Sequence, residues 1–166
     1  TCCQNERVDV GVQGLGQLIG GGLPPASITL LLGPAGSGKT TFGLNFLSLA
    51  TPECPALFFG FYESPQRLRA KGRALGIDIE ALERSGALFI VWNPLTENLL
   101  DSLGHQLLES VRDFRIHRLF IDGMTGFQRA AVHPPRLMEF YSALANELRG
   151  HGVSTIATLE VRDLDG

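Results

Sequence analysis

One continuous stretch of the sequence has residue types and spacing suited to binding phosphate. From Gly33 to Thr40 it reads Gly-Pro-Ala-Gly-Ser-Gly-Lys-Thr, which matches the G-x-x-x-x-G-K-[ST] pattern of phosphate-binding loops, or P-loops. The glycines let backbone N–H groups approach an anion, and the next helix points its N-terminus toward it. Lys39 would bridge the β- and γ-phosphates of a nucleotide, and the Thr40 hydroxyl would hold Mg²⁺. We therefore predict nucleotide binding by Gly33, Pro34, Ala35, Gly36, Ser37, Gly38, Lys39, Thr40 and Thr41.

Asp122 is the second candidate for a role in nucleotide binding. It follows the apolar run Leu119-Phe120-Ile121, well after the P-loop in the sequence. A carboxylate at this position would hold Mg²⁺ through water, opposite the Thr40 hydroxyl. An aspartate at the end of a strand can also simply cap the following loop. Together with the P-loop, the pattern favours a metal site made of Thr40 and Asp122.

Glu63 ends another apolar run and would lie near the γ-phosphate if its strand neighbours that of Asp122. A carboxylate there could orient and deprotonate the attacking water, so Lys39 and Glu63 are the predicted catalytic residues. The alternative is an acidic residue favoured by the dipole of the next helix. Thr158 and Glu160 end a further strand and could sense the γ-phosphate, or they are simply polar residues leaving a buried strand.

Apolar runs alternate with helical patterns along the chain. Strands are predicted over 28–32, 56–62, 87–92, 118–122 and 153–159. Helices are predicted over 41–47, from Pro65 to Gly76, and over 78–84, 97–114 and 136–149. Segments 8–27 and 123–135 are predicted to be loops, the first because of its glycine cluster.

Continuous rather than alternating apolar runs indicate strands that are buried on both faces. The expected fold is therefore α/β, with a mostly parallel sheet and helices on both faces. Ligands of such sheets bind at the carboxyl ends of the strands. The P-loop, Glu63, Asp122 and the Thr158/Glu160 pair should all meet there, which makes this edge the predicted site.

Length, composition and charge favour one globular domain. The 166 residues include 14 Lys and Arg against 17 Asp and Glu, a net charge of -3, so a chain-wide basic surface for nucleic acid is absent. No apolar stretch approaches the ~20 residues of a membrane span, and the N-terminal residues are polar. Cys2, Cys3 and Cys54 lack metal-ligand spacing, which favours free thiols in a reducing compartment. We therefore predict a cytoplasmic protein without a membrane segment.

Several motifs occur together in one order between about Val8 and Glu160. They are Gly14-Leu15 through Gly20-Gly21-Gly22-Leu23-Pro24, Ser27-Ile28-Thr29-Leu30-Leu31-Leu32-Gly33 into the P-loop, Phe61-Tyr62-Glu63-Ser64-Pro65, Leu75-Gly76-Ile77-Asp78, Ile121-Asp122-Gly123-Met124-Thr125 and Thr158-Leu159-Glu160. In this combination the chain resembles the KaiC family, the circadian clock ATPases and their bacterial and archaeal relatives.

The resemblance implies a RecA-like P-loop NTPase core that spans residues 1–166 as one domain, with 1–27 as a Gly-rich lead-in. It also implies ATP with Mg²⁺, and a homohexameric ring with ATP between subunits. Some members of the family phosphorylate themselves on Ser or Thr, and others regulate signalling or transcription through protein partners.

The chain departs from the family pattern at three places. Tyr62 stands where the family usually has the first of two glutamates, which would slow or abolish hydrolysis if that glutamate activates water. Leu15-Gly16 replaces a usual Leu-Asp. Family domains also continue past the end of this chain, with strands that supply trans-acting basic residues and part of the adenine pocket. We therefore expect the C-terminal strands of the domain to be missing here.

Three functions are compatible with these features. The first is a KaiC-like ATPase that uses Mg-ATP to control assembly or signalling. The second is a nucleotide-binding regulatory module with little catalysis, motivated by Tyr62. The third is a recombinase-like, DNA-stimulated ATPase, motivated by the 123–135 loop and by a helix whose basic residues are Arg67, Arg69, Lys71 and Arg73. The simpler interpretation of those basic residues is a solvated face.

Overall fold

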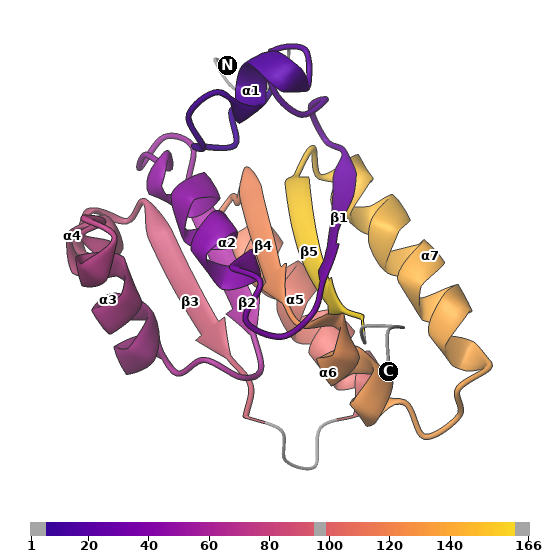
Figure 1. Cartoon of the computed structure of the whole chain (residues 1–166). Helices are drawn as coiled ribbons and strands as arrows, with labels where there is room; N and C mark the ends of the chain where they lie inside the picture. The colour runs from indigo at the N-terminus through magenta and orange to yellow at the C-terminus, as the bar shows by residue number, and fades with distance from the viewer. Residues whose placement is uncertain (1–5, 95–98, 162–166) are drawn as a thin grey trace.

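Five strands form one sheet whose neighbours all pair in parallel (Figure 1). The structure is a computed structural model and describes residues 6–94 and 99–161. The strands are β1 (Ile28–Gly33), β2 (Ala56–Gly60), β3 (Leu88–Trp92), β4 (Arg118–Asp122) and β5 (Ser154–Glu160). Their order across the sheet is β1-β5-β4-β2-β3, so the strand that leads into the P-loop lies beside the last strand. The prediction of a parallel α/β fold is confirmed.

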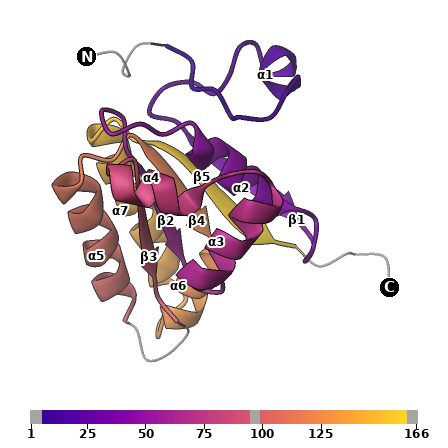
Figure 2. The same cartoon turned by 90° about the vertical axis from the view of Figure 1, so that its left-hand side faces the viewer.

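Helices cover both faces of this sheet, as the two views together show (Figures 1 and 2). Helices α2 (Lys39–Ser48), α3 (Pro65–Ala74) and α4 (Ile79–Ser85) lie on one face. Helices α5 (Leu100–Asp113) and α7 (Arg136–Gly150) lie on the other. Two short helices, α1 (Leu15–Leu18) and α6 (Met124–Ala130), complete the described part.

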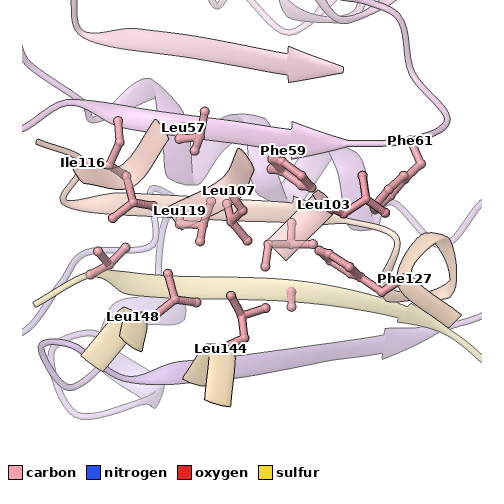
Figure 3. Packing of buried hydrophobic residues seen from close by; sticks show 14 residues of the cluster. Leu57, Phe59, Phe61, Leu103, Leu107, Ile116, Leu119, Phe127, Leu144 and Leu148 are labelled. Carbon is pink, nitrogen blue, oxygen red and sulfur yellow. The ribbon is translucent and has the colours of Figure 1, made fainter. Parts of the chain in front are cut away.

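Alternate residues of the central strands enter different hydrophobic clusters. Leu57, Phe59, Leu119 and Ile121 face α5 and α7, where they pack against side chains such as Leu107 (Figure 3). The residues between them, Phe58 and Phe120, face α2 and α3. Because both faces of β2 and β4 are buried in this way, their sequences lack the alternation of a half-exposed strand.

Helix α2 lies very close to β4, and this closeness depends on a glycine. A Cβ atom added at Gly43 would lie 2.2 Å from Cζ of Phe120, which is too close for any larger residue without movement of the ring. This contact fixes the helix that follows the P-loop over the centre of the sheet. It therefore positions the predicted phosphate site relative to the end of β4.

The glycine-rich lead-in is tied to the opposite end of β4. Val8 and Leu23 form an antiparallel bridge that closes the lead-in into a loop. Arg118, the first residue of β4, donates a hydrogen bond of 2.7 Å to the carbonyl oxygen of Asp9, and its guanidinium group lies 5.0 Å from the ring centroid of Phe46. Partial burial lowers the pKa of Arg118, and these contacts compensate part of the cost of desolvating its cation.

Some sequence expectations are wrong in detail. The predicted loop 123–135 contains α6, and the lead-in contains α1. Helix α5 begins at Leu100; the predicted start at residues 97 and 98 lies outside the described residues. Cys54 is disulfide-bonded, so the expectation of free thiols fails at this residue. Within 6–94 and 99–161, no helix has the length and apolar character needed to cross a bilayer.

Candidate nucleotide site

A cavity of about 350 Å³ opens where the carboxyl ends of β1, β5, β4 and β2 meet. It is lined by Ala35, Gly36, Gly38, Lys39, Thr40, Thr41, Tyr62, Glu63, Lys71, Asp122, Gly123, Thr125, Thr158 and Glu160. The set includes most of the predicted phosphate-binding residues, both predicted metal ligands, the predicted base and both predicted sensors. The convergence expected from strand ends in a parallel sheet therefore occurs.

Lys39 of the P-loop donates hydrogen bonds to the backbone of the same loop. The ammonium group of Lys39 donates to the carbonyl oxygens of Gly33 at 2.8 Å and Pro34 at 2.6 Å, and lies 3.3 Å from the hydroxyl of Ser37. Gly33, Pro34 and Ser37 therefore support Lys39 and do not line the cavity themselves. Gly36 and Gly38 have φ angles of +76° and +86°, and a Cβ atom at either would meet no other atom within 4 Å. This left-handed backbone beside open space suits a loop that turns its amides toward an anion.

Asp122 is the most buried charged group of the cavity, with 7% of its surface exposed. Its Oδ2 accepts a hydrogen bond from the Thr40 hydroxyl, and its Oδ1 accepts one from the Thr158 hydroxyl, both at 3.2 Å. Thr158 in turn accepts a bond of 2.9 Å from the backbone N–H of Gly123. These bonds fix the carboxylate against the first turn of α2.

The pKa of Asp122 reflects this burial. Desolvation raises the pKa, the hydrogen bonds from Thr40 and Thr158 lower it, and among the charged neighbours Glu63 raises it while Lys71 lowers it. A divalent cation at this position would oppose the effect of burial. Mg²⁺ takes hard oxygen ligands, using one or two carboxylates together with substrate phosphates and water. The Asp122 carboxylate and the Thr40 hydroxyl fit that requirement.

Glu63 follows β2, the strand that pairs with β4, and is held by Lys71 of α3. The Lys71 ammonium lies 2.5 Å from Glu63 Oε1, and the two side chains are 45% and 18% exposed. Oε2 of Glu63 is buried and has no hydrogen-bond partner among the residues that the structure describes. The neighbouring Tyr62 is half exposed, and its ring lies against Gly123, where an added Cβ would come within 2.5 Å of it.

The remaining basic residues of α3 point elsewhere. Arg69 pairs with Glu83 at 2.8 Å, and Arg73 pairs with Glu80 at 3.0 Å, both on α4. Three of the four basic side chains of α3 therefore have carboxylate partners within the chain. This pairing favours a structural role over the nucleic-acid surface that motivated a DNA-stimulated activity.

The sequence missed four cavity-lining residues as members of the site. Tyr62 was recognised only as a departure from a pattern, and Gly123 and Thr125 only as part of a motif. Lys71 was grouped with a basic helical face. Glu63 precedes α3 and Lys71 lies eight residues later inside the helix, so no local pattern predicts the contact.

The fold and the cavity together define a P-loop nucleotide-binding protein with a RecA-like α/β core. Comparison with known proteins agrees, because the family model described as ATPase: KaiC matches residues 8–166. The chain therefore belongs to the KaiC family of ATPases.

Individual relatives give the same result. The chain is 29% identical over 169 residues to the circadian clock oscillator protein KaiC of Prochlorococcus marinus subsp. pastoris, covering 95% of this chain and 33% of that protein. It is 37% identical over 128 residues to KaiC of Thermostichus vulcanus, covering 75% of this chain and 24% of that protein. The crystal structure of a KaiC-like protein from Pyrococcus horikoshii OT3 superposes with a TM-score of 0.83 at 30% identity, over 95% of this chain and 71% of that one. The chain thus spans a third or less of these two curated relatives.

Proposed function

We propose that the chain binds ATP with Mg²⁺ and hydrolyses it, as a regulatory ATPase of the KaiC type. The observation that carries this proposal is the meeting of Lys39, Thr40, Asp122 and Glu63 around one cavity at the carboxyl edge of the sheet. These are the groups that phosphoryl transfer requires: a cradle for phosphate, a cation site, and a carboxylate near the reacting group.

Binding uses groups that already point at the cavity or can turn toward it. The N–H groups of the P-loop and of the first turn of α2 donate hydrogen bonds to the phosphate oxygens. The Lys39 ammonium exchanges its bonds to Gly33 and Pro34 for the β- and γ-phosphates. Asp122 and Thr40 would hold Mg²⁺, which neutralises charge on the phosphates when it is bound. Thr158 keeps the Asp122 carboxylate in place.

In hydrolysis, Glu63 acts as the general base. A water oxygen attacks the γ-phosphorus, the bond from this phosphorus to the bridging oxygen breaks, and ADP leaves with that bond's electron pair. Glu63 accepts the proton of the attacking water. Glu160 at the end of β5 lines the same cavity and could sense the γ-phosphate together with Thr158.

Two substitutions test this proposal in the full-length protein. Lys39→Ala should weaken ATP binding on the order of 100-fold, because it removes a charge-assisted contact to two phosphates. Glu63→Gln should not weaken ATP binding and should reduce phosphate release at least 100-fold, within the usual contribution of a general base. Unchanged phosphate release in Glu63→Gln would remove Glu63 from the mechanism.

A second candidate function is nucleotide binding with little hydrolysis. Two observations favour it: Tyr62 places a phenol rather than a second carboxylate beside Gly123, and Glu63 is already paired with Lys71. Tight binding of ATP without phosphate release from the wild-type protein would establish this function instead. The same two assays therefore decide between the candidates.

The proposal also covers the oligomeric state of the protein, its protein partners and its location in the cell. We infer from the family that the full-length protein forms an ATP-dependent homo-oligomer, a hexamer by resemblance, that acts on protein partners in the cytoplasm. Light scattering with and without ATP and Mg²⁺ measures the first point directly. A mass that does not change with nucleotide would contradict control of assembly by ATP.

A further inference from the structure

Lys71 differs from its neighbours on α3 in the direction it takes. Arg69 and Arg73 reach α4, where each pairs with a glutamate. Successive residues of a helix are about 100° apart, so a residue two positions away projects from nearly the opposite side. Lys71 accordingly reaches the end of β2 and lines the nucleotide cavity beside Glu63.

In the Lys71–Glu63 pair, each side chain keeps hydrogen-bonding capacity that its partner does not satisfy. An ammonium group has three donors, and the Lys71 side chain is 45% exposed, with Glu63 Oε1 as its ion-pair acceptor. Within the described part of the chain, the other oxygen of Glu63 is buried without a hydrogen-bond partner, and such a group costs free energy. The pair is also within electrostatic reach of the predicted metal ligand, since Lys71 lowers and Glu63 raises the pKa of Asp122.

A triphosphate in this cavity would offer the Lys71 ammonium a second acceptor besides Glu63. Its terminal phosphate would bring negative charge next to Glu63 and Asp122, two carboxylates that repel it. Lys39 is held at the P-loop after β1, whereas Lys71 is held by Glu63 after β2, and β5 and β4 lie between these two strands. A flexible lysine with donors to spare can turn from a carboxylate to a more strongly charged acceptor.

We propose that Lys71 is a second phosphate-binding cation, which turns from Glu63 to the terminal phosphate when ATP binds. The inference rests on the proposed function, since it requires ATP in this cavity. ADP lacks the terminal phosphate, so with ADP the Lys71–Glu63 pair persists. Lys71 is thus a residue that distinguishes ATP from ADP, and its movement frees Glu63 to contact a water molecule.

Nucleotide affinities of the full-length protein test the selectivity. Dissociation constants for ATP and for ADP, each with Mg²⁺, are measured for the wild type, Lys71→Met and Arg67→Met. Lys71→Met should weaken ATP binding about tenfold and change ADP binding less than twofold, since it removes one charge-assisted contact. Arg67→Met removes a cation from the same helix but not from the cavity, and should change neither. Equal effects of Lys71→Met on both nucleotides, or none, would overturn the proposal.

A double-mutant cycle with Glu63→Gln tests the exchange itself. Glu63→Gln should tighten ATP binding when Lys71 is present, because the ammonium no longer divides between two acceptors. The gain should be at least threefold smaller in the Lys71→Met background, where only the removed repulsion remains. Equal gains in both backgrounds would make Lys71 a structural partner of Glu63 and nothing more.

The cycle also guards against unfolding and against failure of the underlying function. Lys71→Met leaves Glu63 without its cation, so the double variant, which removes both charges, supplies the comparison if the single variant is unstable. A wild type that binds no ATP overturns the proposed function and this inference together. A wild type that binds ATP through Lys39 but shows no dependence on Lys71 overturns this inference alone.

Discussion

The two walls of the nucleotide cavity differ in how fully their polar groups are paired. On the P-loop wall, made of Lys39, Thr40, Asp122 and Thr158, every side chain has hydrogen bonds within the chain. On the Glu63 wall, made of Tyr62, Glu63 and Lys71, one carboxylate oxygen is buried without a partner. On the first wall, Asp122, Thr40 and Thr158 are fixed to one another before any ligand binds and only Lys39 exchanges partners, whereas the second wall is an ion pair that a ligand can rearrange.

This difference separates two tasks. Binding requires fixed donors and a fixed cation site, because groups that need not reorganise lose less free energy on association. Hydrolysis requires a base that meets water only when the terminal phosphate is present. We therefore expect substitutions on the P-loop wall to change affinity, and substitutions on the Glu63 wall to change turnover or the discrimination between ATP and ADP.

The largest expected effect belongs to Asp122 on the P-loop wall. Asp122→Asn should abolish the part of ATP affinity that depends on Mg²⁺, on the order of 100-fold, because the amide cannot replace a charged metal ligand. ATP titrations in Mg²⁺ and in EDTA measure this part. Glu63→Gln is the matched control, since it makes the same change on the other wall and should retain the Mg²⁺ effect. Loss of that effect in Glu63→Gln would erase the distinction between the walls.

Thr158 gives the next effect, on stability rather than affinity. Thr158→Val removes a hydroxyl that bridges Asp122 and the N–H of Gly123, so Oδ1 of Asp122 and this N–H lose that partner. The free energy of unfolding should fall by about 1–3 kcal/mol in urea titrations. Thr155→Val is the control on the same strand, because the Thr155 hydroxyl is buried without a partner and its removal should be neutral or stabilising. Equal losses in both variants would mean that the Thr158 bridge contributes nothing specific.

The P-loop wall was also the part that the sequence could predict. Its residues are local in sequence or stand at strand ends, and strand ends in a parallel sheet must meet at one edge. Lys39 and Thr40 follow from a contiguous motif, and Asp122 from an apolar run of the right length. Thr158 was predicted as a sensor, and its geometry adds a contact to Asp122 that only the register of β4 and β5 reveals.

On the other wall the sequence predicted Glu63, but it could not predict the contact of Glu63 with Lys71 in the same way. Lys71 reaches Glu63 because α3 packs over the sheet in one orientation. The contact therefore depends on tertiary packing and not on a local pattern in the sequence. Its neighbours in the sequence, Arg69 and Arg73, gave the misleading impression of a uniform basic face. Helix α6 was missed for a related reason: only seven residues long, it contains Gly126, where an added Cβ would meet the ring of Phe61 at 2.3 Å. Packing rather than helix propensity therefore explains this element.

Tyr62 offers a way to sharpen the contrast between the walls. Tyr62→Glu places a second carboxylate beside Glu63, in the position where relatives are expected to carry one, and should raise phosphate release about tenfold. ATP affinity should fall less than tenfold, because the added carboxylate repels phosphate but leaves the contacts of the P-loop wall in place. Tyr62→Phe removes only the hydroxyl and should leave turnover at the wild-type level. If Tyr62→Glu weakens ATP binding without raising turnover, the added charge only repels phosphate, and the nucleotide-binding module becomes the better description.

The smallest effect concerns the stability of the ligand-free protein in EDTA as a function of pH. Burial raises the pKa of Asp122 in the folded chain above its ordinary value of 3.8. At a pH between the pKa of the unfolded chain and that of the folded chain, the folded chain therefore holds a proton that the unfolded chain has lost. Stability therefore falls as pH rises through this window, and the fall should be absent from Asp122→Asn. Urea titrations of both proteins at several pH values from 3.5 upward measure the difference. The effect is small because the Thr40 and Thr158 hydroxyls offset part of the burial. A difference that instead rises with pH would mean that these hydrogen bonds outweigh burial, so that the P-loop wall stabilises its carboxylate even without a metal ion.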